Sequence, residues 1–166
     1  MSKRDVTRVN RLSRAVWVVI AVVVFVGDQV TKAIVEESIP EHTTIPVIPH
    51  FLNLIYTHNP GAAFGLFSDS PAPWKTALLI VVSSLLLAMV VAVLWRSPRL
   101  RWEAGVGLAL ILGGALSNLF DRIRLGRVVD FIDVYCRSHH WPTFNLADSA
   151  IVVGAGFLVF QLLFLE

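Results

Sequence analysis

The chain has 166 residues, of which 55% are apolar and only 16% are charged. An average soluble domain carries about 25% charged residues, so this composition argues against an ordinary soluble domain and excludes a disordered chain. The formal net charge is +2, which provides no concentrated basic face for binding nucleic acid. The single cysteine allows no internal disulfide and no thiolate metal cluster.

Four apolar segments each predict a membrane helix. The first, residues 15–27, reaches spanning length only if it continues to about Val35, which places Asp28 and Lys32 near its far end. A signal-peptide core is the alternative, but no small-x-small cleavage site follows, so we expect an uncleaved helix. Three further runs carry no charged residue: 76–94, 104–120 and 149–165. Each approaches the span of roughly 20 residues that a bilayer core requires.

The distribution of basic residues predicts the orientation. Lysine and arginine cluster before the first span and again between the second and third, so the positive-inside rule places these segments and both termini in the cytoplasm. We expect residues 1–14 to form a basic cytoplasmic tail and residues 15–166 to form a single membrane domain. All five tryptophans fall near predicted span ends, as in an aromatic belt: Trp17, Trp74, Trp95, Trp102 and Trp141.

The first outer segment predicts a small β element on the membrane surface. Prolines between residues 39 and 50 favour extended chain, Phe51 to Thr57 is β-prone, and Asn59-Pro60-Gly61 is a strong turn signal. Three apolar residues that follow could rest among lipid headgroups: Phe64, Leu66 and Phe67. The expected fold class is an all-α membrane protein, a four-transmembrane-helix bundle with a small extracytoplasmic β cradle.

Small and polar residues in the spans predict helix contacts and a polar face. Four small residues recur four apart in the third span, where they permit close helix approach: Gly105, Ala109, Gly113 and Ser117. We interpret Ser117 as a packing residue. Asn118, Asp121 and Arg122 share a face of the same span, and Asp28 and Lys32 are spaced for an ion pair. These charges either support a site or anchor the helices at the interface.

Two carboxylates stand out beside the spans. Asn145-Leu146-Ala147-Asp148 has the form of a helix N-cap, so capping is one explanation for Asp148. Asp130 interrupts an apolar run, and an exposed strand position is one explanation for it. The other explanation is that antiparallel third and fourth spans bring both acids to the outer rim. A close carboxyl pair shares one proton and can activate water, and the helix N-terminus favours the charge on Asp148.

Other chemistries have weaker support in the sequence. There is no H-E-x-x-H zinc motif, and Cys136 has no evident activating base. We expect His42, His50 and His58 to be surface residues. Among the remaining acids, we expect Asp121 to pair with neighbouring arginines and Asp133 to lie on the surface.

Five blocks of sequence resemble one known family. They are Asp28-Gln29-x-Thr31-Lys32; Asn59-Pro60-Gly61-Ala62-Ala63-Phe64-Gly65; Gly113-Gly114-Ala115-Leu116-x-Asn118-Leu119-x-Asp121-Arg122; Val128-Val129-Asp130-Phe131-Ile132; and Phe144-Asn145-Leu146-Ala147-Asp148-Ser149. In this order they resemble the lipoprotein signal peptidases (signal peptidase II), bacterial aspartic endopeptidases of the plasma membrane. The resemblance covers residues 15–165, and Ser117 stands where the family more often has glycine.

The resemblance implies a function and a set of site residues. Asp130 and Asp148 would be the catalytic dyad, and six residues would form its polar support: Asn59, Asn118, Arg122, Asn145, Asp28 and Lys32. The substrates would be prolipoproteins carrying a diacylglyceryl-cysteine, cut just before that cysteine, and globomycin-type peptides would inhibit. We expect no metal or organic cofactor. The active site would lie near the outer leaflet of the inner membrane. We expect the enzyme to be a monomer. A small proton-coupled transporter and a non-catalytic assembly subunit are the alternative functions.

Overall fold

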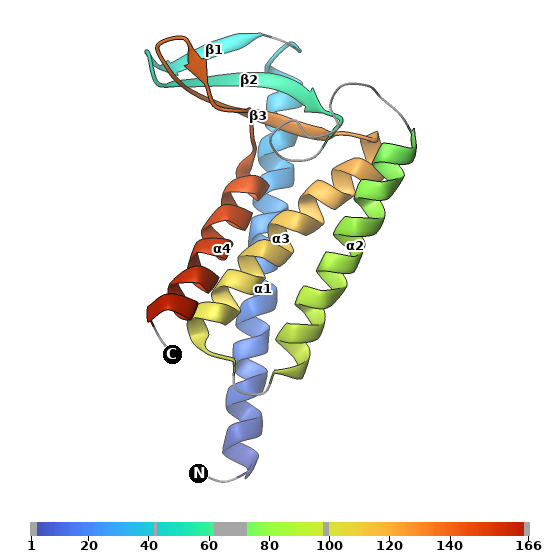
Figure 1. Ribbon diagram of the computed structural model, residues 1–166, viewed down its shortest axis with the longest axis vertical. Helices are drawn as coiled ribbons and strands as arrows, with labels where there is room; N and C mark the ends of the chain where they lie inside the picture. The colour runs from blue at the N-terminus through green and yellow to red at the C-terminus, as the bar shows by residue number, and fades with distance from the viewer. Residues whose placement is uncertain (1–2, 42, 62–72, 98–99, 165–166) are drawn as a thin grey trace.

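In the computed structural model, four helices stand side by side beneath a small antiparallel sheet (Figure 1). The structure describes residues 3–41, 43–61, 73–97 and 100–164, with side chains from residue 14 onward except that of Pro73. The helices are α1 (Lys3–Ser38), α2 (Pro73–Arg96), α3 (Trp102–Leu125) and α4 (Leu146–Phe164). The strands are β1 (Thr44–Ile48), β2 (Leu52–Asn59), β3 (Val128–Cys136) and β4 (His139–His140). Both termini lie at the end of the bundle opposite the sheet (Figure 1).

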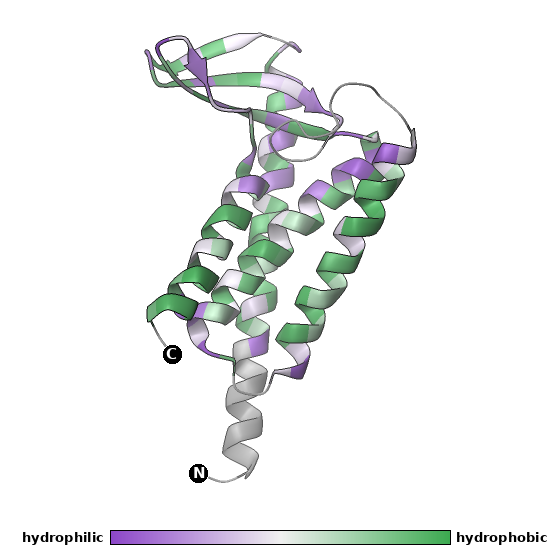
Figure 2. Cartoon of the chain, in the orientation of Figure 1, coloured by the Kyte–Doolittle hydropathy of each residue, from purple (hydrophilic) through white to green (hydrophobic). Residues whose placement is uncertain are grey.

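All four helices contain a segment long and apolar enough to cross a membrane. These segments are Arg14–Ser38, Trp74–Arg96, Trp102–Leu125 and Leu146–Phe164. They match the four predicted spans, and the first continues through Asp28 and Lys32 as expected. Apolar residues cover the middle of the bundle, whereas hydrophilic residues gather where α1, α3 and α4 meet the sheet (Figure 2). The polar groups that could do chemistry are therefore concentrated at one end of the bundle.

Helix α3 is the centre of the bundle and contacts the other three helices. Its predicted stripe of small residues faces α1, where a Cβ on Gly113 would lie 2.5 Å from the Ala21 carbonyl oxygen. A second small surface faces α4, where a Cβ on Gly107 would lie 2.7 Å from the Gly154 carbonyl oxygen. Glycine is therefore required at both contacts, because a side chain would push the helix axes apart.

The sheet has the strand order β1-β2-β3-β4, with all neighbours antiparallel. Strand β2 confirms the predicted β element, and the Asn59-Pro60-Gly61 turn signal stands at its end. Strand β3 follows α3 directly, and Thr57 of β2 is the pairing partner of Asp130. Val35, Ile39 and Phe131 form a small apolar cluster that joins the end of α1 to the sheet. Phe64, Leu66 and Phe67 lie outside the described residues.

The aromatic-belt prediction is wrong for one tryptophan. Trp17 is only 4% exposed, because its ring packs on Trp102, with ring centroids 4.6 Å apart, and fills the space beside Gly105. The other four tryptophans are exposed: Trp74, Trp95, Trp102 and Trp141. Tertiary packing thus takes one aromatic residue from the predicted belt into the core.

Candidate active site

The N-terminus of α4 is capped by its own sequence. The Asp148 backbone N–H donates to the Asn145 side-chain Oδ1 at 2.9 Å, and the Asn145 backbone N–H donates to Asp148 Oδ2 at 3.3 Å. This reciprocal pair is the capping box that the sequence predicts. Capping occupies only one carboxylate oxygen of Asp148, so it does not by itself account for the whole group.

Asp130 lies on β3 directly beside this cap. It is only 1% exposed, so the alternative of an exposed strand position is wrong. Its Oδ1 accepts a hydrogen bond from Asn145 Nδ2 at 2.8 Å, and its Oδ2 accepts one from Asn59 Nδ2 at 3.1 Å. Asn145 is itself fully buried and donates to both carboxyl groups, to Asp130 through its amide nitrogen and to Asp148 through its backbone N–H.

Burial and a neighbouring negative charge change the acidity of Asp130. Loss of hydration, followed by the charge on Asp148, raises the pKa of Asp130 to about 7. The amide hydrogen bonds from Asn59 and Asn145 and the charge on Lys32 act in the opposite direction. Asp130 therefore remains protonated at a pH where an ordinary aspartate is ionised. A pair of carboxyl groups that shares one proton requires one such protonated member.

Asn118 connects Asp148 to a buried lysine. Its Nδ2 donates to Asp148 Oδ1 at 2.7 Å, while its Oδ1 accepts from Lys32 Nζ at 3.1 Å. Because an ammonium group can only donate, Lys32 fixes the direction of the Asn118 amide. The nitrogen of that amide is consequently turned toward the second oxygen of Asp148.

Lys32 is the centre of a buried ion cluster. Its Nζ lies 2.6 Å from Asp28 Oδ2 and 2.7 Å from Asp121 Oδ2. Asp121 therefore pairs with Lys32 of α1, and the expectation that it pairs with neighbouring arginines is wrong. The other oxygen of Asp28 accepts the backbone N–H of Ala147 at 2.9 Å, in the first turn of α4. The cluster joins α1 and α3 to the residue before Asp148, so the interfacial-anchor alternative does not describe it.

Two neutral side chains complete this cluster, and sequence reasoning missed their role. Ser117 Oγ donates to Asp28 Oδ2 at 2.7 Å, so its interpretation as a packing residue is incomplete. Gln29 Nε2 donates to Ser117 Oγ and to Asp121 Oδ1, each at 2.8 Å. The place of Gln29 beside Asp28, in the first of the family blocks, is the signal in the sequence that could have indicated this role.

Arg122 connects the turn after β2 to the end of α3 by hydrogen bonds. Its guanidinium donates to the Gly61 carbonyl oxygen at 3.0 Å and to the Asn118 carbonyl oxygen at 3.2 Å. The Gly61 N–H in turn donates to Asn59 Oδ1 at 2.9 Å, which forms an Asx turn. Asn59 can therefore present its amide nitrogen to Asp130. All eight site residues expected from the sequence lie in one connected hydrogen-bond network.

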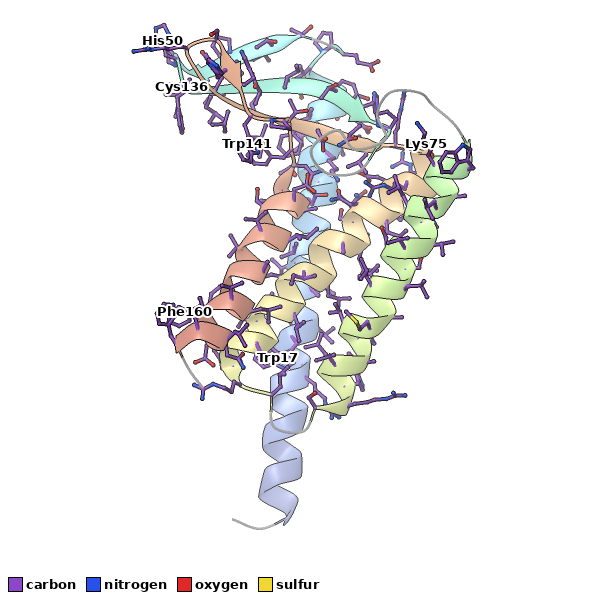
Figure 3. All side chains as sticks on the ribbon, viewed as in Figure 1. Trp17, His50, Lys75, Cys136, Trp141 and Phe160 are labelled. Carbon is purple, nitrogen blue, oxygen red and sulfur yellow. The ribbon has the colours of Figure 1, made fainter. Side chains whose placement is uncertain are left out.

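Other polar groups of the sheet lie apart from this network. Asp133 is buried and accepts hydrogen bonds from Asn53 Nδ2 at 2.8 Å and His140 Nδ1 at 2.7 Å, so the expectation of a surface position is wrong. His58 Nδ1 lies 2.8 Å from Glu41 Oε1, and its side chain is only 9% exposed, again against expectation. Cys136 is exposed at the edge of the sheet that projects away from the helices (Figure 3). Among the described residues, no three His, Cys, Asp or Glu side chains are grouped to hold a metal ion.

Comparison with known proteins agrees with this geometry. The family model described as Signal peptidase (SPase) II matches residues 20–164. A Lipoprotein signal peptidase of Solibacter usitatus is 44% identical over 144 residues, which are 87% of this chain and 88% of the relative. One from Xylella fastidiosa is 42% identical over 149 residues, 90% of this chain and 89% of the relative.

Solved structures agree with the fold. A bacterial membrane enzyme solved by the in meso method at 2.3 Å resolution is 34% identical and superposes with a TM-score of 0.81, over 90% of this chain and 88% of that one. A second, solved at 1.9 Å resolution, is 32% identical with a TM-score of 0.78, over 92% and 95% of the two chains. The transporter alternative finds no support among these relatives.

Proposed function

Because the chain belongs to the signal peptidase II family, and so removes signal peptides from prolipoproteins, we propose that Asp130 and Asp148 are its catalytic pair. The observation that carries this proposal is the position of Asn145, whose amide nitrogen donates to Asp130 while the residue caps the helix that bears Asp148. This arrangement holds one carboxyl group of raised pKa beside another that is bonded to neutral donors. Such a pair provides an acid and a base together.

The chemical step follows from the protonation states. The Asp148 carboxylate removes a proton from a water molecule, whose oxygen attacks the carbonyl carbon of the scissile peptide bond. Asp130 donates its proton to the carbonyl oxygen, which gives a neutral tetrahedral diol. When the diol collapses, the C–N bond breaks, the amine nitrogen takes the proton held by Asp148, and a hydroxyl proton returns to Asp130. Atoms and charges balance over one molecule of water consumed.

The six other site residues would hold this pair in place. Asn59, Asn145 and Asn118 donate amide hydrogen bonds to the two carboxyl groups. Lys32 orients Asn118, and Asp28 holds the first turn of α4 through the Ala147 N–H. Arg122 binds the turn that carries Asn59. None of these donors needs to move when charge passes between the carboxyl groups, so the site is preorganised.

The position of the pair at the sheet end of the bundle supports a membrane-bound substrate. We expect the basic N-terminal end of α1 to lie in the cytoplasm with both termini, and the sheet and dyad to lie at the outer leaflet of the inner membrane. A signal peptide crossing the bilayer as a helix would then reach Asp130 and Asp148 at its outer end. Its diacylglyceryl-cysteine would keep its acyl chains in the lipid, with cleavage just before that cysteine, and globomycin-type peptides would compete for the site. A monomer contains every residue that this mechanism uses.

The test is cleavage of a diacylglyceryl-modified lipobox peptide by purified protein in detergent. Asp130→Asn and Asp148→Asn should each lower kcat by about 10²–10⁴-fold, as expected when a general acid or base is lost. Asp133→Asn is the matched control, since it is a buried aspartate of the same strand that bonds to Asn53 and His140 instead. A folded Asp130→Asn or Asp148→Asn protein that cleaves at the wild-type rate would exclude the aspartic mechanism.

A further inference from the structure

The ion cluster below the dyad contains more negative than positive charge among its directly bonded groups. Asp28, Lys32 and Asp121 are almost completely buried, and one ammonium serves two carboxylates. A buried carboxylate is costly unless hydrogen-bond donors or cations replace the water that it has lost. The remaining carboxylate oxygens therefore depend on neutral hydrogen-bond donors.

Ser117 and Gln29 supply two of the neutral donors of the cluster, as a connected pair. The fully buried Ser117 hydroxyl must donate to Asp28, because a carboxylate only accepts, and the distance is 2.7 Å. The same oxygen then accepts from Gln29 Nε2, which also donates to Asp121 Oδ1. The Gln29–Ser117 pair thus bridges the two carboxylates in addition to Lys32, from Asp28 Oδ2 to Asp121 Oδ1.

Asp28, which accepts from Ser117, is also bonded to the first turn of α4. With Ser117 and Lys32 both on Asp28 Oδ2, the other oxygen, Oδ1, is directed at the Ala147 N–H at 2.9 Å. One carboxylate of α1 is therefore tied to α3 through Ser117 and to α4 through the residue that precedes Asp148. Lys32 connects Asp28 to α3 only indirectly, through its own bonds to Asp121 and Asn118, whereas Ser117 bonds to Asp28 directly from α3.

We infer that Ser117 and Gln29 are positioning residues of the peptidase: their hydrogen bonds hold Asp28 in the orientation that sets the first turn of α4, and with it the carboxylate of Asp148. This inference rests on the catalytic role proposed for Asp148. The described hydrogen bonds of both side chains go to each other and to Asp28 and Asp121, so they act on the dyad through Asp28. Loss of the Ser117 hydroxyl leaves a charged acceptor short of one donor in a buried site, where such a bond is strong.

The experiment compares Ser117→Ala, Gln29→Ala, Asp28→Asn and the double variant Ser117→Ala/Asp28→Asn in the lipobox-peptide assay. Ser84→Ala is the matched control, because Ser84 is exposed on α2. The described hydrogen bond of its hydroxyl goes to the Ile80 carbonyl oxygen of the same helix. We expect Ser117→Ala and Gln29→Ala to lower kcat about tenfold at unchanged KM, as for loss of one hydrogen bond to a charged group. The double variant should be no slower than Asp28→Asn, since the two changes remove the same tie.

The outcomes separate this inference from the proposed function. Wild-type kcat in both Ser117→Ala and Gln29→Ala, or losses that multiply in the double variant, would overturn the inference while Asp148→Asn remains inactive. Cleavage by a folded Asp148→Asn protein would overturn the proposed dyad, whatever Ser117→Ala does. If Ser117→Ala does not fold, the kcat of Gln29→Ala decides the question, because that change removes the other half of the bridge and leaves the Ser117 hydroxyl in place. A role in stability alone would lower the unfolding temperature and leave kcat per folded molecule unchanged.

Discussion

Asn145 and Asp148 hold each other at the start of α4, through one hydrogen bond of 2.9 Å and a second of 3.3 Å between backbone and side chain. This cap also fixes the Asn145 amide nitrogen on Asp130. The local motif that begins a helix therefore also aligns the two carboxyl groups. Capping and catalysis, which are alternative explanations of Asp148 in the sequence, are compatible in the structure.

Asn145→Ser should separate the two roles of this residue. Serine caps helices about as well as asparagine, so the unfolding temperature should change little, apart from the cost of a small cavity. Serine has no amide nitrogen to donate to Asp130, so we expect kcat to fall at least about tenfold. Steady-state cleavage and thermal unfolding of the same preparation provide the measurement. Equal losses of activity and stability would contradict the proposed alignment.

The rate of cleavage should depend on the ionisation of Asp130. Its pKa of about 7 means that the protonated acid is abundant below pH 7 and is lost above it. We expect kcat/KM to decline as the pH rises through about 7, which a pH–rate profile in detergent would show. A rate that stays constant from pH 6 to pH 9 would contradict Asp130 as the proton donor.

The same pKa predicts the effect of pH on stability. Because folding raises the pKa of Asp130 from 3.8 to about 7, the unfolded chain loses this proton first. The contribution of Asp130 to stability is therefore fully present below pH 3.8 and is lost as the pH rises toward 7. At pH 8 we expect Asp130→Asn to unfold at a temperature a few degrees above wild type, by about 2–4 °C for each kcal/mol. At pH 4 the two proteins should unfold at similar temperatures.

Asn59→Ala should move the pH profile. The Asn59 amide lowers the pKa of Asp130 by donating to its Oδ2, so removal of the amide should raise this pKa and shift the decline in rate to higher pH. Asn53→Ala is the control in the same strand, because Asn53 donates to Asp133 instead. It should lower stability without moving the profile. A shift of the same size in both variants would contradict a specific role for Asn59.

Lys32→Met should be strongly destabilising. It leaves Asp28 and Asp121 buried without their shared cation, at a cost of about 3–5 kcal/mol. A second change, Asp121→Asn, should recover part of that stability because it removes one of the two uncompensated charges. Thermal unfolding of the single and double variants tests this. A double variant less stable than Lys32→Met would show that Asp121 does not depend on Lys32.

Gly154→Ala should disturb the contact between α3 and α4. A Cβ at this position would lie 2.5 Å from the Gly107 carbonyl oxygen, so the helices would have to separate. Gly156→Ala is the matched control, since a Cβ there would meet no described atom within 4 Å. We expect Gly154→Ala to unfold several degrees below wild type and to cleave more slowly, because α4 carries Asp148. Gly156→Ala should behave as wild type.

The sequence alone determines the parts of this protein that depend on neighbouring residues. Hydropathy over about 20 residues predicts each membrane helix, because a bilayer core sets that length. Proline and glycine predict the turn beside Asn59, and the spacing of Asn145 and Asp148 predicts the cap of α4. The family motifs indicated which residues belong to the site, although their roles in catalysis remain predictions.

Only the tertiary structure decides which of these polar residues are partners. The bond from Ala147 to Asp28 joins positions 119 residues apart, and those from Lys32 to Asp121 and from Gln29 to Ser117 join α1 to α3. No local period encodes such pairs, so the sequence misassigned Asp121 to arginines and Ser117 to packing alone. The helices come close enough for these bonds because glycines at their contacts remove side-chain bulk, and the buried charges then take the nearest donors.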